Sequence, residues 1–351
     1  MSAVLDWLVA YLFRWFPRSA PTGLFPIGNP DEYSPVIVTA NFSLTIRRVQ
    51  RALEGHNVWL LVASSGGINV WCAADGGLFT HHRIIDAIKV SGLADRVRHR
   101  QLLLPALSAS GIDLEAIPEA TGFRARFGPV YAQDIPAYVE AGQRKTGAMR
   151  RFDFGWKHRV DMFLPMNFPV YLLVAMVLAV FWPQHLVGYT ILFWSAVAFL
   201  YVFLDAIPGK TGWGQALGSA TLFAVGWAAV DASLRGDPLV HWGWLLASFG
   251  IFFAAGLDLA GTVSPRRSDA ELMMQRLGFK SFGSLFSERD LGEITLDRNR
   301  CKGCGSCQDI CPIGVYGELD EDRKTTFRDR SACFACNACV TQCPEDALSL
   351  D

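Results

Sequence analysis

Two stretches near the C-terminus share one spacing: CKGCGSCQDICP, residues 301–312, and CFACNACVTQCP, residues 333–344. In each stretch two residues separate the first three cysteines, three residues precede the fourth cysteine, and a proline follows it. This spacing is typical of chains that bind two [4Fe-4S] clusters, where the fourth cysteine of each run ligates the other cluster. The predicted ligand sets are Cys301, Cys304, Cys307 and Cys343 for one cluster, and Cys311, Cys333, Cys336 and Cys339 for the other.

Zinc is the alternative metal for any two cysteines separated by two residues, because four thiolates also suit a tetrahedral zinc site. Two copies of a run that ends in Cys-Pro favour iron instead, and they predict a small α+β module of the bacterial 2[4Fe-4S] ferredoxin type over residues 290–351. Eight of the nine cysteines lie in these runs, which indicates metal ligation in a reducing compartment and not a disulfide framework. Such a module moves single electrons and does not define a substrate.

The chain upstream of this module is strongly apolar, and 51% of all residues are hydrophobic. Four apolar stretches lie at residues 163–182, 186–204, 213–234 and 239–260. Each is close to the ~20 residues that an α-helix needs to cross a bilayer core. Four buried helices of a soluble core are the alternative, but the scarcity of charge favours a four-helix transmembrane domain at residues 163–260 and a linker at 261–289.

The charges around these stretches predict an orientation. Lysine and arginine residues precede the first span and follow the fourth, whereas the connectors that would face outward hold only Arg235. The positive-inside rule therefore predicts a multi-pass protein of the cytoplasmic membrane with both soluble domains in the cytoplasm. Asp205, Asp231 and Asp258 lie near span ends, where they cap helices or, alternatively, form part of a proton path. The formal net charge of −1 gives no indication of nucleic acid as a partner.

Residues 1–160 contain two further predicted parts. The apolar run at residues 4–16 is broken by Asp6 and Arg14, which predicts an interfacial helix within residues 1–20 and not a signal peptide. Residues 21–160 alternate predicted strands, at 36–39, 58–63, 102–104 and 123–127, with predicted helices at 44–53 and 80–90. This alternation is typical of an α/β domain. No glycine-rich phosphate loop follows any of these strands, so a nucleotide-binding site is not supported.

The ninth cysteine, Cys72, lies in GINVWCAADGG, residues 67–77. A single cysteine with apolar neighbours is more often an inert packing residue than a ligand. NVWCAA, residues 69–74, however, resembles the signature of the mercury-methylating corrinoid proteins. The resemblance extends to SPVIVTANFSLTIRRVQRAL at residues 34–53 and to FGPVYAQDIPAYV at residues 127–139. The cysteine-rich tail is similar to the separate ferredoxin partner of that family, so the chain looks like a fusion of the two.

This resemblance implies a Rossmann-like domain that binds a cobalamin-type corrinoid. The related corrinoid iron-sulfur proteins of acetyl-CoA metabolism share this cobalt-binding half. In the family the signature forms a helix that caps the cobalt, and its cysteine is the lower axial ligand. The implied cofactor-binding residues are Asn69, Val70, Trp71, Cys72, Ala73 and Ala74, and Cys72 is the implied catalytic residue and cobalt ligand. Two departures stand out: Asp75 and Gly76 replace a Gly-Lys pair, and no cysteine follows Cys343 where the partner ferredoxin has a C-terminal pair.

The implied function is that of a membrane-anchored, corrinoid-dependent methyltransferase in which the fused ferredoxin reduces the cobalt. Its methyl acceptor would be mercury(II) or a similar soft electrophile. Such an anaerobic enzyme would need a methyl-donating corrinoid or folate methyltransferase system and a low-potential electron donor, besides the lipid bilayer. Two alternatives stay open: a membrane-bound iron-sulfur electron-transfer protein without corrinoid chemistry, and a corrinoid-binding redox sensor without turnover.

Overall fold

The computed structural model describes residues 3–14, 16–203, 217–226, 229, 246, 249–250 and 293–350. These residues fall into two compact units. The first contains the described residues within Met1–Ala10, Phe16–Phe152 and Phe282–Asp351, and the second those within Tyr11–Trp15 and Asp153–Ser281. Most of the predicted third and fourth spans, the predicted linker, and the three aspartates at predicted span ends lie outside the described residues.

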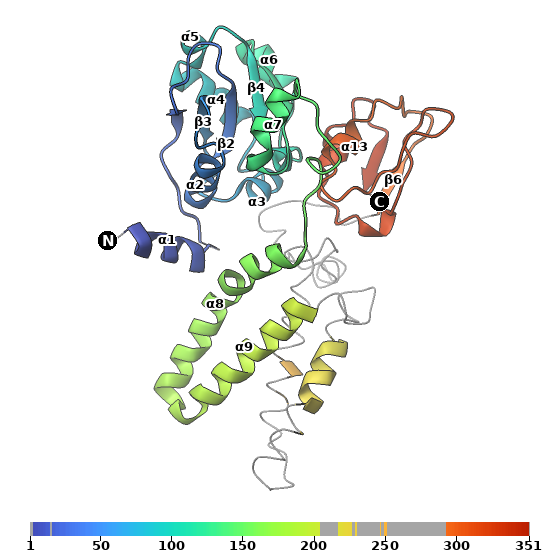
Figure 1. Ribbon diagram of the computed structural model, residues 1–351. Coiled ribbons are helices and arrows are strands. Elements are labelled where there is room, and N and C mark those ends of the chain that lie inside the picture. The colour runs from blue at the N-terminus through green and yellow to red at the C-terminus, as the bar shows by residue number, and fades with distance from the viewer. Residues whose placement is uncertain are drawn as a thin grey trace. The chain divides into compact units, whose positions relative to one another are not determined.

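A five-stranded sheet forms the centre of the first unit, in the order β1-β3-β2-β4-β5. Its central strands β3, β2 and β4 are labelled in Figure 1. The strands are β1 (Gly23–Ile27), β2 (Val36–Ala40), β3 (Val58–Ala63), β4 (Gln101–Leu104) and β5 (Arg124–Phe127). Strands β3, β2, β4 and β5 are parallel, whereas β1 pairs antiparallel with β3 at one edge. Because β2 leads to β3 on one side and β4 leads to β5 on the other, the connections diverge between β2 and β4.

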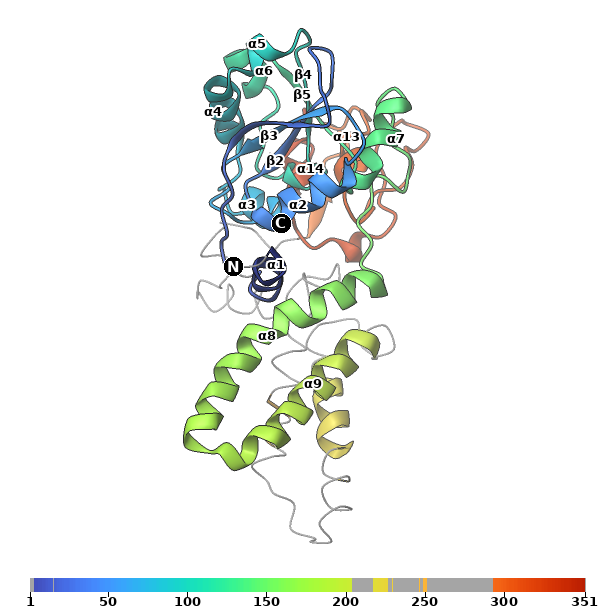
Figure 2. The same cartoon turned by 60° about the vertical axis from the view of Figure 1, so that its left-hand side comes forward.

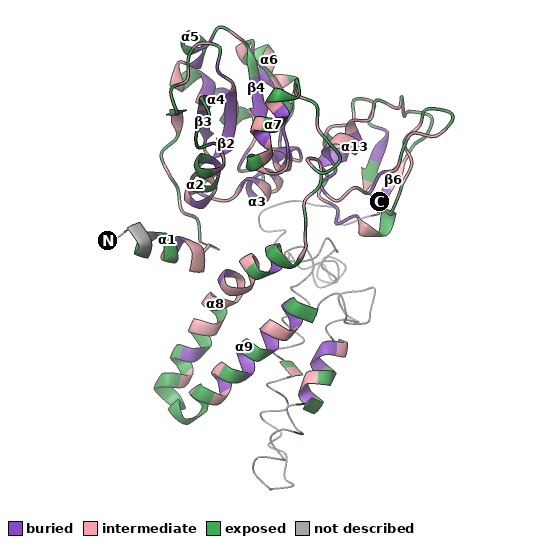
Figure 3. Cartoon of the chain, in the orientation of Figure 1, coloured by how far each residue is buried: buried purple, intermediate pink, exposed green. Residues whose placement is uncertain are grey.

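Helices cover both faces of this sheet, as Figure 2 shows for α4 and α2 on opposite sides. The helices are α2 (Ser43–Ala52), α3 (Val70–Asp75), α4 (His81–Ser91), α5 (Leu93–Arg96), α6 (Ala116–Thr121) and α7 (Ile135–Glu140). Alternate strand residues face opposite layers: Val38 and Leu61 pack with α4 and α6, whereas Ile37 and Leu60 pack with α2 and α7. Burial on both faces explains the continuous apolar runs of the central strands, which are coloured as buried in Figure 3.

The predicted elements of this domain are confirmed to within a few residues. The strands at 36–39, 58–63, 102–104 and 123–127 correspond to β2, β3, β4 and β5, and the helices at 44–53 and 80–90 to α2 and α4. Helix α4 ends at Gly92, whose φ of +63° is favoured by glycine. Strand β1 was not predicted, because the short run GLFPI contains a proline. An edge position tolerates that proline.

The cysteine-rich tail is closed by two short strands, one at each of its ends. Strand β6 (Ile294–Leu296) pairs antiparallel with β7 (Leu348–Leu350), so the two ends of the tail lie side by side. The helices α13 (Ser306–Ile310) and α14 (Ala338–Thr341) contain the third cysteine of each run, Cys307 and Cys339. The rings of Tyr316 and Phe327 stack with 5.5 Å between their centroids, and the two residues form an isolated antiparallel bridge outside the named strands.

The α/β domain and the tail share one hydrophobic core. Ile310 of α13 and Ala338 of α14 are 6% and 7% exposed, and both pack into the core that lies between the sheet and α4. The Gln342 side chain donates hydrogen bonds to Ala109 O at 2.8 Å and to Ile112 O at 2.5 Å. The domain predicted at residues 21–160, up to Phe152, thus forms one compact unit with the tail predicted at 290–351, because apolar side chains of the tail complete the larger core, whereas residues 153–160 belong to the second unit.

The second unit contains a helical hairpin, α8 (Trp156–Phe181) and α9 (Leu186–Phe203), joined by a short 3-10 turn at Pro183–His185. Aromatic side chains hold the hairpin together, including a stacked pair of Tyr171 and Tyr189, and the Tyr171 hydroxyl lies 3.0 Å from Thr190 Oγ1. Both helices have the length and apolar composition needed to cross a membrane. They correspond to the predicted spans at 163–182 and 186–204, although α8 begins earlier. A shorter apolar helix, Leu217–Gly226, is also described.

Helix α1 (Ala3–Leu12) occupies the predicted interfacial segment. Leu5, Trp7 and Leu8 are between 39% and 46% exposed on it. Near its end the Tyr11 hydroxyl donates a hydrogen bond to Asp161 O at 2.9 Å, and Arg14 forms an ion pair with the Asp161 carboxylate at 3.4 Å. These two contacts connect the end of α1 to the start of α8.

Candidate metal centres

Helix α3 presents Cys72 on its exposed side. Asn69 is the N-cap residue, and its Oδ1 accepts a hydrogen bond from the Cys72 backbone N–H at 3.0 Å. The same side chain donates from Nδ2 to Cys72 Sγ at 3.2 Å. Asn69 therefore satisfies a backbone group that the start of a helix would leave unpaired, and it also orients the thiol.

The other side of α3 faces the core. Val70, Ala73 and Ala74 are 9%, 0% and 2% exposed, and Val70 and Ala73 pack into the core beneath α3. The six residues with an implied cofactor-binding role thus divide into two groups. Asn69, Trp71 and Cys72 are accessible, whereas the other three anchor the helix.

Helix α3 lies at the carboxyl ends of the parallel strands. It follows β3 after a short loop and contacts the 3-10 turn η1 (Ala106–Ser108), which follows β4. A Cβ atom at Gly111, just beyond this turn, would collide with the Ala74 carbonyl oxygen, so this loop lies directly against α3. In open α/β sheets, ligands bind outside the carboxyl ends of the strands where the connections diverge. Cys72 is at this edge.

Two cavities in the tail collect the eight clustered cysteines. Cys301, Cys304, Cys307 and Cys343 line one of them, together with Thr325 and Leu348. Cys311, Cys333, Cys336 and Cys339 line the other, together with Tyr316 and Phe334. The structure therefore groups the cysteines as the spacing predicts, with the fourth cysteine of each run beside the first three of the other. Their role as cluster ligands stays a prediction.

The two cysteine runs adopt the same backbone conformation. Positive φ angles occur on both sides of the second cysteine, at Gly303 and Gly305 in the first run and at Ala335 and Asn337 in the second. Successive reversals of this kind turn thiols and backbone amides toward one point. Amides also approach the exchanged sulfurs, since Val315 N lies 3.4 Å from Cys311 Sγ and Ala347 N lies 3.3 Å from Cys343 Sγ.

The buried cysteine thiols are chemically suited to bind an iron-sulfur cluster as its ligands. Burial raises the pKa of the Cys307, Cys311 and Cys339 thiols, because their thiolates lose hydration. A bound cation removes this penalty, since it takes the place of the proton and neutralises the thiolate charge. The donor set of sulfur atoms with few other polar groups suits iron-sulfur ligation.

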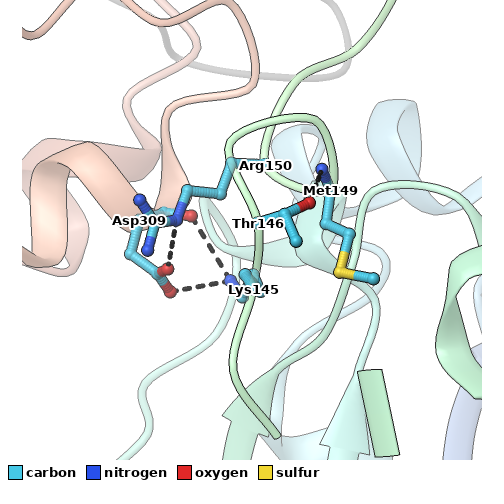
Figure 4. A network of polar contacts seen from close by, with 5 residues as sticks. All are labelled: Lys145, Thr146, Met149, Arg150 and Asp309. Atoms are coloured by element: carbon cyan, nitrogen blue, oxygen red, sulfur yellow. Dashed lines mark hydrogen bonds and ion pairs between the residues drawn. The ribbon is translucent and has the colours of Figure 1, made fainter. Parts of the chain in front are cut away.

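The contacts that hold the tail on the α/β domain were not predicted from the sequence. Asp309 in α13 forms ion pairs with Lys145 Nζ at 2.7 Å and with Arg150 Nε at 3.1 Å (Figure 4). The Lys145 side chain is only 4% exposed. Burial lowers the pKa of this amine, while the hydrogen bond to Asp309 opposes the shift. Lys145 and Arg150 were noticed in the sequence only as two of the basic residues that precede the first span. The positive-inside rule explained them by membrane orientation alone.

The metal content tests the cysteine assignment directly. Anaerobically purified protein should contain about eight irons per chain, because two [4Fe-4S] cubes use all eight clustered cysteines. The Cys304→Ala variant should retain about four irons and a less stable tail, since metal binding and folding are coupled in small modules. Iron and zinc are measured together by elemental analysis, and stoichiometric zinc without iron would reject the assignment.

Both the α/β domain and the cysteine-rich tail of the first unit match models of known protein families. Residues 13–139 match the family model described as CO dehydrogenase/acetyl-CoA synthase delta subunit. Residues 300–348 match the model described as 4Fe-4S dicluster domain. The tail is therefore similar to iron-sulfur domains, and the expected relation of the α/β domain to proteins of acetyl-CoA metabolism is confirmed. Neither model concerns mercury methylation, which stays a prediction.

The curated relatives of this chain are also proteins of acetyl-CoA metabolism. The chain is 48% identical over 96 residues to the acetyl-CoA decarbonylase/synthase complex subunit gamma of Methanocaldococcus jannaschii, which covers 27% of this chain and 20% of that protein. It is 36% identical over 137 residues to the subunit of the same name from Methanopyrus kandleri, which covers 38% of this chain and 28% of the relative. The chain thus spans about a fifth to about a quarter of the length of these curated relatives.

Proposed function

We propose that this chain is a membrane-anchored, corrinoid-dependent methyltransferase whose iron-sulfur tail supplies electrons to the cobalt. The observation that carries the proposal is the position of Cys72, which is exposed on a short helix at the carboxyl ends of the parallel strands. This helix lies within the segment that matches the acetyl-CoA synthase subunit model. A packing cysteine would be expected on the buried side of α3, beside Val70 and Ala73.

Cys72 would hold the corrinoid through its thiolate, and Asn69 would keep the sulfur in one orientation through the 3.2 Å hydrogen bond. When bound, a corrinoid supplies a cobalt atom that takes up a methyl group and gives it away. A thiolate is a soft, anionic ligand that donates strongly to a transition metal. Its donation favours departure of a methyl group with both bonding electrons, which is the form that a soft electrophile accepts.

The eight tail cysteines would hold two [4Fe-4S] clusters, which supply single electrons at low potential. Their attachment to the same chain raises their effective concentration near Cys72 without any new contact. The electrons would come from a low-potential donor, and the methyl group from a corrinoid or folate methyltransferase system.

Mercury(II) or a similar soft electrophile is the proposed methyl acceptor. The support is the resemblance of residues 69–74 to the mercury-methylating signature. Asp75 and Gly76 replace the Gly-Lys pair of that signature at the end of α3, so an anion stands where the family has a cation nearby. If Cys72 proves essential, the Gly76→Lys variant tests whether these two residues set the acceptor.

An anaerobic absorption spectrum with a cobalt and iron count tests the proposed function. Protein produced with corrinoid available should contain about one cobalt per chain beside its iron. Iron without cobalt would favour the alternative, a membrane-bound electron-transfer protein. Bound cobalt without methyl transfer to any soft electrophile would favour a redox sensor.

The membrane anchor makes a separate prediction. The chain should stay in the membrane fraction after alkaline carbonate washing, because α8 and α9 are long and apolar enough to span a bilayer. In sealed vesicles with the cytoplasmic face inward, protease added outside should spare both Cys72 and the tail, as the basic flanks predict. Immunoblots for each end follow the cleavage, and loss of only one end would indicate an odd number of spans.

A further inference from the structure

The two cysteine runs are alike in backbone but differ in their surroundings. The residue after the first cysteine is Lys302 in the first run and Phe334 in the second. Lys302 is exposed, whereas Phe334 is only 9% exposed. Cys304, the second cysteine of the first run, is also exposed. The first cysteine loop therefore exposes Lys302 and Cys304, whereas the corresponding residues of the second loop, Phe334 and Cys336, are buried or half-buried.

The second run contacts the helix that carries Cys72. The Phe334 ring lies edge to face with the Trp71 ring, with 5.2 Å between their centroids. Trp71 directly precedes Cys72, and Phe334 stands between two cysteines of the second cavity. Cys336 of the same cavity packs against the core that contains Val70 and Ala73. The second cavity and the Cys72 helix are thus joined by one aromatic contact and a continuous apolar layer.

Polar contacts hold the tail in this position. Asp309 lies in α13, between the last two cysteines of the first run, and pairs with Lys145 and Arg150 of the α/β domain (Figure 4). Phe152 N donates a hydrogen bond to Pro312 O at 2.6 Å, and the Phe152 ring lies 5.6 Å from Trp71. Ion pairs, a backbone hydrogen bond and a ring contact therefore hold the residues around the second cavity against the α/β domain.

The loop that contains the first three cysteines of the first run, residues 301–307, makes its described contacts within the tail, whereas Asp309, Ile310 and Pro312 contact the α/β domain. The Lys324 side chain donates a hydrogen bond to Cys301 O, and Gly303 lies against the carbonyl group of Arg323. The loop that lines the first cavity is in this way supported by residues 323 and 324 and leaves Lys302 and Cys304 at the surface.

We propose that electrons cross the tail in one direction, entering at the first cysteine set and leaving from the second set through Phe334 and Trp71 toward Cys72. This inference rests on the proposed function. Each passage moves one electron: the cluster held by the second set is oxidised by one electron, the cobalt is reduced by one, and a low-potential donor restores the electron through the first set. Phe334 and Trp71 are positioning residues, since their rings lie between the second cysteine set and Cys72 and neither side chain is a proposed metal ligand.

Phe334→Leu and Lys302→Leu form a matched pair, because the same new side chain enters equivalent positions of the two runs. The full-length, corrinoid-loaded chain is mixed anaerobically with titanium(III) citrate, and stopped-flow absorbance follows iron-sulfur bleaching and cobalt reduction separately. Phe334→Leu should bleach at the parental rate but reduce cobalt at least tenfold more slowly. Lys302→Leu should leave the cobalt step at the parental rate, and Phe334→Tyr should restore it.

A second measurement shows whether the tail stays docked. In the corrinoid-free chain, hydrogen exchange at residues 70–75 should rise in Asp309→Lys and remain parental in Phe334→Tyr. The inference is overturned if Phe334→Leu, with parental iron and parental exchange, reduces cobalt as fast as the parent, or if Lys302→Leu, with bleaching at the parental rate, slows the cobalt step as much as Phe334→Leu does. Either result leaves the proposed function standing, whereas a parent chain that binds no cobalt would overturn the function itself.

Discussion

The Cys72→Ala variant should bind iron normally and lose methyl transfer. The thiol is exposed, so its removal should change the free energy of unfolding by only about 0.5 kcal/mol, as for most surface substitutions. Cys72 is the one cysteine that lies in the α/β domain, and the remaining eight line the two cavities of the tail. The expected result is an altered cobalt spectrum, no methyl product, and an unchanged iron-sulfur signal.

Three measurements on the same sample make this result decisive. Methyl product is measured by chromatography, cobalt coordination by absorbance, and iron by elemental analysis. A packing role for Cys72 predicts slightly lower stability with an unchanged corrinoid spectrum. If Cys72→Ala transfers methyl groups as fast as the parent, Cys72 is not the ligand and the resemblance of residues 69–74 has no mechanistic meaning.

The Gly303→Ala variant should lose one of the two clusters, with iron falling from about eight to about four per chain. Gly303 has a φ of +67°, and a Cβ atom there would overlap the carbonyl oxygen of Arg323. Positive φ alone is not the obstacle, because Ala335 occupies the equivalent position of the second run at a φ of +60°. The loop must therefore move to admit the methyl group, and its three cysteines move with it.

Gly305→Ala is the matched control for this variant. Gly305 also has a positive φ, of +78°, but the nearest atom to its Cβ position is Gln308 Oε1 at 3.9 Å. A residue with a Cβ in this conformation costs about 1–2 kcal/mol, so Gly305→Ala should be less stable but retain its iron. Full iron content in Gly303→Ala would show that the first loop tolerates displacement and that its geometry does not control cluster binding.

Local patterns in the sequence predicted most of what lies within single segments. The cysteine runs carry their geometry in their spacing, and the two cavities contain the predicted sets of cysteines. The central strands were recognisable because both faces of the sheet are buried, which produces runs such as VIVTA and VWLLVA. Strand β1 and the short helices α6 and α7 carry weaker patterns and were not predicted.

Contacts between distant segments could not be predicted in the same way. Nothing about Phe334 distinguishes it from any apolar residue in a cysteine loop until Trp71 is found beside it. Asp309 likewise looks like a solvated helix residue until its partner Lys145 is seen to be buried. Such pairs depend on how the tail meets the α/β domain, and a single sequence contains no periodic signal for that.

The shared core also determines how the protein responds to air. Ile310 and Ala338 fill part of the core beneath α3, and they belong to helices α13 and α14, which contain the third cysteine of each run. If the proposed clusters form, their destruction by oxygen should unfold the tail, because metal binding and folding are coupled in small metal-binding modules. The α/β domain would then expose the apolar surface that these helices cover, and exposed patches of this kind promote aggregation. Damage to the proposed clusters would in this way reach the α/β domain that carries Cys72.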